Sequence, residues 1–287
     1  MKHCYKLLSE LIQLHQECDR LVFHDKSEGL LRSIGTIKVL SEVFEANLLN
    51  DQFIRRKWSS FDIPHLPIYS DTFIDLKYHM FMPARSKKMD VVSYLIHDHM
   101  DYILSSYVLM GGGYRSFEFE KDYRESSGDT LTISKEFYHG KNSFYVLDSW
   151  RPHVICKVVS PTATLVLWSK GNSKNDNDKT RKIYYPKGGR LICISEEKFI
   201  DLVKNNVGFE DNSEQHIQAI CFFMQELGYQ NTEFLKDLIY KNDLPVRWKT
   251  WLSYLYSGKK IDCPYFNYEI NTLQQEITIT EIINVCR

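Results

Sequence analysis

The stretch from Ser93 to Gly113, SYLIHDHMDYILSSYVLMGGG, decides the fold expected for this chain. It carries two histidines, His97 and His99, on a strand-like pattern, and it ends on three consecutive glycines. Because alternate side chains of a strand point to the same face, both imidazoles are expected to reach one ion. The glycines Gly111–Gly113 are expected to form a hairpin turn with positive φ angles before a second strand.

Short strand patterns continue on both sides of this stretch. Runs of β-branched and aromatic residues, separated by Gly, Pro and polar breakers, extend from Thr72 to about Ser195 without a helical pattern between them. Ten strands at this spacing predict an antiparallel sandwich or barrel. The expected strands are Phe73–Phe81, Val91–His99, Ser105–Met110, Tyr114–Glu120, Thr130–Ile133, Ser143–Leu147, His153–Val159, Thr164–Trp168, Lys182–Tyr185 and Arg190–Ile194.

Helical periodicity precedes the β-rich region. Apolar residues recur every three or four positions from Leu7 to Cys18 and again from Glu28 to Arg55, which predicts two helices. The segment Phe61–Tyr69 contains Pro64 and Pro67, and a turn-rich connection is expected there.

Helical periodicity also follows the strands. Helices are expected to begin at Ser195, Ser213, Thr232 and Pro245, whereas the last twenty residues fit a helix or a strand equally. The fold class is therefore mainly β with flanking helices. We divide the chain into an N-terminal helical segment (1–69), a β-barrel that carries the metal site (70–195) and a C-terminal helical segment (196–287).

Composition excludes several classes of protein. The 287 residues include 36 Lys and Arg against 37 Asp and Glu, and this net charge of -1 argues against nucleic acid as the main partner. No apolar run approaches the roughly 18 residues of a membrane span, and charges interrupt the start too often for a signal peptide. Seven cysteines without zinc-type spacing indicate reduced thiols. We expect a cytoplasmic protein that binds no membrane.

A third imidazole is needed to complete a metal site. His153 follows a turn at Pro152 and begins a later strand, so it is the best candidate, and His139 is an alternative third ligand or a base. The competing interpretation is that two histidines two positions apart arise by chance in a chain with ten. The glycine twelve residues after His99 argues against chance.

These residues resemble the cupin family. Its first motif has two histidines two positions apart, then a glutamate, then a glycine; here His97 and His99 match, Leu104 stands at the glutamate position, and Gly111 matches the glycine. Its second motif ends in a histidine that His153 matches. The resemblance covers under half of the chain and implies an antiparallel jelly-roll barrel. It departs from the second motif because Asp148, Trp150 and Lys157 replace the usual Pro, Gly and Asn.

The segments Ile96–His99, followed by Asp101, and Trp150–Val154 look like the thiol dioxygenase branch of the cupins. The resemblance implies a three-His Fe(II) centre that uses dioxygen to oxidise a small thiol or amino-acid-like metabolite, with Zn, Ni, Mn or Cu as alternative metals. Without the glutamate, the metal keeps its positive charge and about three open positions. Two alternatives stay open, a non-redox isomerase, cyclase or lyase and a metal-holding binding module. The flanking helices are expected to cover the barrel or to form the interface of a homodimer.

Other polar residues of the barrel are candidates for binding or chemistry. An arginine can hold a substrate carboxylate, a tyrosine can donate its phenol proton, and Asp101 can orient an imidazole. Each of them is also explained by an ordinary structural role, an exposed strand arginine or a core aromatic. The catalytic candidates are Tyr102, Tyr107 and His139, and the substrate-binding candidates are Arg85, Arg115, Arg151 and Tyr114.

Overall fold

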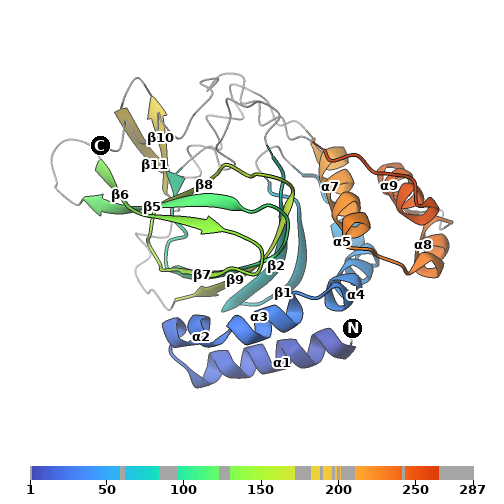
Figure 1. Cartoon of the computed structure of the whole chain (residues 1–287), viewed down its shortest axis with the longest axis horizontal. Coiled ribbons are helices and arrows are strands. Elements are labelled where there is room, and N and C mark those ends of the chain that lie inside the picture. Colours follow the sequence, from blue (N-terminus) through green and yellow to red (C-terminus); the bar gives the residue numbers. More distant parts are fainter. Residues whose placement is uncertain are drawn as a thin grey trace.

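The computed structural model describes residues 2–58, 62–83, 96–122, 130–171, 182–187, 190–195, 198, 201, 211–240 and 243–264. Two antiparallel β-sheets face each other and form a barrel, and helices cover one side of it (Figure 1). The expected antiparallel β-barrel with flanking helices is confirmed. In the described part of the chain, no helix has both the length and the apolar character needed to cross a bilayer.

The first sheet has five strands in the order β1-β2-β9-β4-β7, and the second has six in the order β11-β10-β3-β8-β5-β6. Neighbouring strands in both sheets pair in antiparallel fashion, as expected for this class of barrel. The strands are β1 (His65–Ser70), β2 (Ile74–Phe81), β3 (Ile96–His97), β4 (Tyr102–Met110), β5 (Tyr114–Asp122), β6 (Thr130–His139), β7 (Phe144–Leu147), β8 (His153–Cys156), β9 (Thr162–Lys170), β10 (Lys182–Lys187) and β11 (Arg190–Ser195).

The triple glycine joins the two sheets and does not close a hairpin. Strand β4 pairs with β7 and β9, whereas β5 pairs with β6 and β8, so the expected hairpin arrangement is wrong. The positive φ angles are present, at 106° for Gly111 and 82° for Gly113. A Cβ on Gly111 would lie 2.2 Å from the carbonyl oxygen of Pro161, so the crossing also needs glycine for space.

Strand β1 corrects the prediction of a turn-rich connection. Residues His65–Ser70 form the edge strand of the five-stranded sheet even though Pro67 lies among them. Proline is tolerated at an edge because one side of the strand has no ladder partner that needs its missing N–H. The carbonyl of Pro67 instead accepts a hydrogen bond from Asn47 Nδ2 at 2.8 Å.

The first expected N-terminal helix is confirmed by α1, whereas the second is divided into shorter helices. The single helix expected over Glu28–Arg55 is divided near Gly35, where Thr36 caps a new helix, and again at Asn50, whose side chain caps another. The helices there are α1 (Lys2–Glu17), α2 (Arg20–Lys26), α3 (Glu28–Ile34), α4 (Ile37–Leu48) and α5 (Asp51–Ile54).

The C-terminal helices agree with three of the four expected starts. They are α7 (Ser213–Glu226), α8 (Thr232–Ile239) and α9 (Val246–Ser257). The helix expected from Ser195 lies largely outside the described residues, and the last twenty residues lie wholly outside them.

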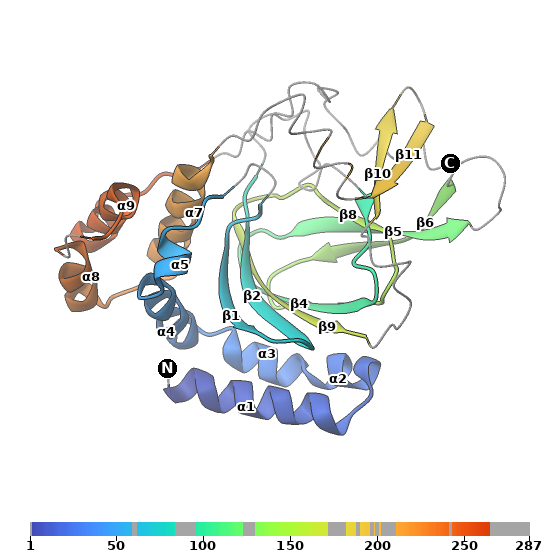
Figure 2. The same ribbon diagram turned by 180° about the vertical axis from the view of Figure 1, so that it is seen from behind.

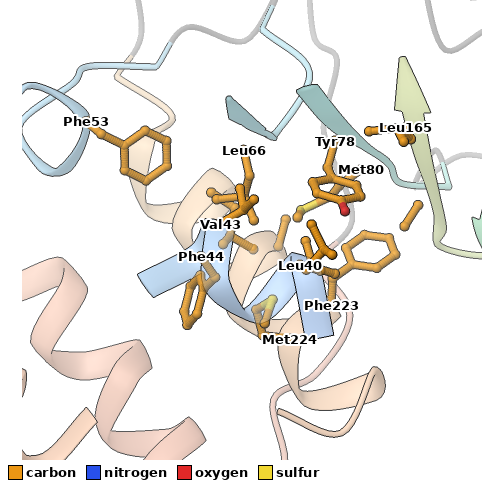
Figure 3. Packing of buried hydrophobic residues seen from close by; sticks show 14 of the residues in the cluster. Leu40, Val43, Phe44, Phe53, Leu66, Tyr78, Met80, Leu165, Phe223 and Met224 are labelled. Carbon is orange, nitrogen blue, oxygen red and sulfur yellow. The ribbon is translucent and has the colours of Figure 1, made fainter. Parts of the chain in front are cut away.

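The main core lies between the helices and the outer face of the five-stranded sheet. Helices α2 and α3 contact β4, while α4 and α7 contact β1 and β2 (Figure 2). Alternate residues of β2, among them Tyr78 and Met80, pack against Leu40 of α4 and Phe223 of α7 (Figure 3). Full burial of one such side chain is worth roughly 1.5–3 kcal/mol. This packing turns the apolar face of β2 toward the helices, so the polar residues of the strand face the barrel interior.

Candidate metal centre

Three imidazoles converge where strands β3 and β8 pair. The ring centroids of His97, His99 and His153 lie 4.5–5.0 Å apart, and one nitrogen of each ring lies within 4.8 Å of the others. His97 is 8% exposed and His153 is 5% exposed. Imidazole nitrogens at such separations fit a single divalent transition-metal ion.

Strand pairing brings these residues together across the sheet. His97 of β3 is the direct antiparallel partner of His153 of β8, so their side chains share a face. His99 follows β3, where the chain turns through Met100, a non-glycine residue with a φ of 54°. The carbonyl of Met100 accepts the N–H of Trp150 at 2.7 Å, and Trp150 also has a positive φ of 59°. Two strained residues thus join the segments that carry His99 and His153.

The orientation of His153 suits metal binding. Its Nδ1 lies 3.3 Å from the carbonyl oxygen of Arg151. A backbone carbonyl can only accept a hydrogen bond, so this contact favours the tautomer that is protonated at Nδ1 and leaves Nε2 with a lone pair. Histidine ligands in metal sites commonly have their second nitrogen held in this way.

A helix outside the barrel holds the loop after His99. Arg20 of α2 donates to Asp101 Oδ1 at 2.9 Å, to the carbonyl of Asp101 and to the carbonyl of Ser169 at 3.2 Å. The N–H of Gly171 donates to the same Asp101 carbonyl at 3.0 Å. The carboxylate of Asp101, expected to orient an imidazole, is therefore bound to Arg20.

The same helix is fixed to the barrel by a buried histidine. His24 lies between Ser105 Oγ, 2.8 Å from its Nδ1, and Ser169 Oγ, 2.7 Å from its Nε2. Burial, with a smaller effect of Arg20, lowers the pKa of His24 to about 3. The ring is neutral at physiological pH and can donate to one serine while accepting from the other.

The five-stranded sheet provides a polar and aromatic wall beside His99. The indole of Trp168 lies 6.2 Å from the His99 ring and 5.2 Å from His79, measured between centroids. The Lys77 ammonium lies 4.7 Å from the centre of the Trp168 ring and pairs with Asp75 at 2.8 Å. A small molecule at the imidazoles would therefore meet a flat aromatic face and a charged pair.

The six-stranded sheet adds a carboxylate that sequence reasoning missed. Glu118 of β5 is the direct partner of His153, whereas Leu104 is paired with Trp168 and Leu147 in the other sheet. The barrel thus has a glutamate beside the imidazoles, but on a different strand from the one the motif uses. Alternation along β5 shows which residues of that strand share a face with Glu118. The sequence does not show which strand pairs with β5.

His139 lies close to the centre but outside the group of three. Its Nε2 lies 2.7 Å from Ser116 Oγ, and its ring stacks on Tyr114 with centroids 4.4 Å apart. Burial, with smaller effects of His153 and Lys135, lowers the pKa of His139 to about 3. Burial also raises the pKa of Tyr114. Both residues are neutral, buried groups of the barrel interior at physiological pH.

The other candidate residues differ in their position. Tyr107 faces the helices, where its hydroxyl donates to Asn142 Oδ1 at 3.1 Å and its ring lies 4.9 Å from the Arg32 guanidinium. Tyr102 begins β4, and its N–H donates to the carbonyl of His99 at 3.1 Å. Tyr102 therefore lies close to His99 in the chain, whereas Tyr107 lies on the outer face of the same sheet.

The three arginine candidates also separate. Arg115 is exposed and forms an ion pair with Glu136. Its direct partner on β8 is Cys156, which packs in a separate cluster of buried apolar residues. Arg151 lies two residues before His153, and its carbonyl contacts that ring. Arg85 lies outside the described residues. Of the arginines in the described part of the chain, Arg151 is therefore the candidate next to the imidazoles.

Comparison with known proteins identifies no family. No family model and no curated protein matches the chain. Similar solved structures include a chain of the DMSP lyases RdDddP and RnDddQII, with 14% identity over 39% of this chain and 49% of that chain and a TM-score of 0.26. The Schizosaccharomyces pombe Cnp3 cupin domain has 10% identity, coverages of 39% and 64% and a TM-score of 0.27. An RmlC-like cupin from Desulfovibrio desulfuricans has 14% identity, coverages of 38% and 86% and a TM-score of 0.25. The chain spans about half of the DMSP lyase, and these similarities assign it no activity.

Proposed function

We propose that this protein is a mononuclear metal enzyme whose ion is bound by His97, His99 and His153 and whose small substrate enters the barrel. The observation that carries the proposal is the approach of three imidazole nitrogens to within 4.8 Å of one another. Three neutral imidazoles that face one another at this spacing are a donor set that a divalent transition-metal ion binds, and the binding free energy would stabilise the fold. The contact of His153 with the Arg151 carbonyl supports the same role.

The finer proposal is an Fe(II) oxygenase that acts with dioxygen on a small amino-acid-like or thiol metabolite. An iron ion would supply the redox chemistry with dioxygen, and the chain would supply orientation and a dry pocket. Neutral imidazoles leave the ion its full positive charge, which favours an anionic substrate group. Trp168 and Leu104 would exclude water from one side of the pocket, since they are direct partners in the pairing of β4 with β9 and share a face.

A non-redox reaction on zinc is the second candidate, because three neutral imidazoles are also a donor set for catalytic zinc. The two candidates are separated by elemental analysis of freshly purified protein, followed by oxygen-uptake measurements with a panel of thiols and amino acids. Iron together with substrate-dependent uptake supports the oxygenase. Zinc without uptake supports an isomerase, cyclase or lyase, or a binding module. Protein that takes up no metal at all contradicts both.

A further inference from the structure

Glu118 extends the row of histidines across the six-stranded sheet. In the register of the sheet, Glu118 of β5 is paired with His153 of β8, and His153 is paired with His97 of β3. Direct partners on antiparallel strands point to the same face, with Cβ atoms roughly 4.5–5.5 Å apart. The carboxylate of Glu118 therefore lies on the face that carries the imidazoles and next to His153.

The carboxylate is only partly satisfied by the protein. Its Oε1 is buried and has no hydrogen-bond partner among the described residues. Burial raises the pKa of Glu118, whereas the charges of Lys135 and Arg151 act in the opposite direction. Lys135 is exposed, so its charge is screened by water. A buried acceptor without a donor costs about 1–3 kcal/mol, a cost that a bound molecule with a donor would remove.

We propose that Glu118 accepts a hydrogen bond from a hydroxyl or ammonium group of the substrate while a neighbouring group of the same molecule binds the metal. This inference rests on the proposed metal site and narrows the substrate class. The substrate is a small molecule in which a metal-binding group, such as a carboxylate, is adjacent to a hydrogen-bond donor. Glu118 then selects for the donor, and the imidazoles select for the metal-binding group.

The test uses protein loaded with Co²⁺, whose visible absorption reports ligand binding at the metal. Glycolate and methoxyacetate are the probes, because both offer a carboxylate and an adjacent oxygen but only glycolate has a hydroxyl donor. Their dissociation constants are measured for the wild type, Glu118→Gln and Glu118→Asp. Glu120→Gln is the matched control, because Glu120 is exposed on the same strand two residues further on.

The wild type and Glu120→Gln are expected to prefer glycolate, and Glu118→Gln is expected to reduce that preference about tenfold. Glu118→Asp, which keeps the carboxylate, should retain part of it and serves if Glu118→Gln does not fold. An equal preference in the wild type and Glu118→Gln, or no preference in the wild type, overturns the inference. Loss of Co²⁺ from Glu118→Gln alone also overturns it, because Glu118 would then be a metal ligand. Failure of the wild type to bind Co²⁺ contradicts the proposed function itself.

Discussion

His97 and His153 are direct partners in the antiparallel pairing of β3 with β8, and their ring centroids lie 4.5 Å apart. The position of one ring is therefore fixed by backbone hydrogen bonds to the strand that carries the other. His99 is different, because it lies beyond the end of β3 and depends on the loop that follows. Two of the three proposed ligands are thus held by the sheet, and His99 is held by contacts of the loop.

Replacement of a cluster histidine by alanine is expected to abolish stoichiometric metal binding. A site of three imidazoles retains too few donors once one is removed, so His97→Ala and His99→Ala should each purify without metal. Inductively coupled plasma analysis of the folded variants measures this. His15→Ala on α1, outside the cluster, is the control and should keep the wild-type content. Retention of metal by the cluster variants would mean that the site assignment is wrong.

The buried His24 is expected to make the protein less stable in acid. Its pKa of about 3 in the folded state is below the ordinary value of 6.5. Its contribution is therefore complete above pH 6.5 and is lost as the pH falls from 6.5 towards 3. His24→Gln should show a smaller loss of unfolding free energy than the wild type between pH 7 and pH 4.5, measured by urea titration.

Ser105→Ala is the matched control for this effect. It removes one hydrogen bond of His24 and keeps the titrating ring, so stability should fall by roughly 1–3 kcal/mol at neutral pH while the pH dependence persists. A wild-type pH dependence in His24→Gln would show that His24 is not the group responsible. Residual dependence in that variant is expected, because burial also lowers the pKa of His65 to about 4.

The sequence predicts the barrel and the three histidines because both depend on local signals. Alternation and turn residues identify most strands, and the spacing of His97 and His99 is visible directly. Sequence patterns do not predict strand β1, because Pro67 indicates a break. Proline is acceptable there only because the strand lies at a sheet edge. The position of Glu118 beside His153 is not predicted either, because the register between strands is a property of the folded sheet.

The number of residues between two positions on a strand determines whether their side chains share a face, as the two candidate tyrosines of β4 show. Tyr102 and Tyr107 are five residues apart on β4, so they point to opposite faces and cannot both line the barrel interior. The sequence does not tell which face is inside, because both faces of this strand carry apolar residues. The packing of Tyr107 against Arg32 settles its side.

Arg20 is expected to act on metal affinity from outside the barrel. Its hydrogen bonds to Asp101 and Ser169 hold the loop that follows His99, so Arg20→Gln should weaken Zn²⁺ binding about tenfold. Competition with a chromophoric chelator, well below the unfolding temperature, measures the affinity. Arg32→Gln is the matched control, because Arg32 pairs with Glu28 on α3 and donates to the carbonyl of Asn142 in a different loop. Equal affinities in the two variants would exclude a positioning role for Arg20.

Gly111 and Gly228 are expected to respond differently to the same substitution. Both have positive φ angles, 106° and 77°, so alanine strains the backbone at either position by about 1 kcal/mol. A Cβ on Gly111 would also lie 2.2 Å from the Pro161 oxygen and 2.6 Å from Thr162 Cα, whereas nothing lies within 4 Å at Gly228. Gly111→Ala should therefore lower the unfolding free energy by roughly 1–3 kcal/mol more than Gly228→Ala, because backbone at the sheet crossing must move. Urea titration of both variants measures the difference, and equal losses would show that the crossing is looser than this contact implies.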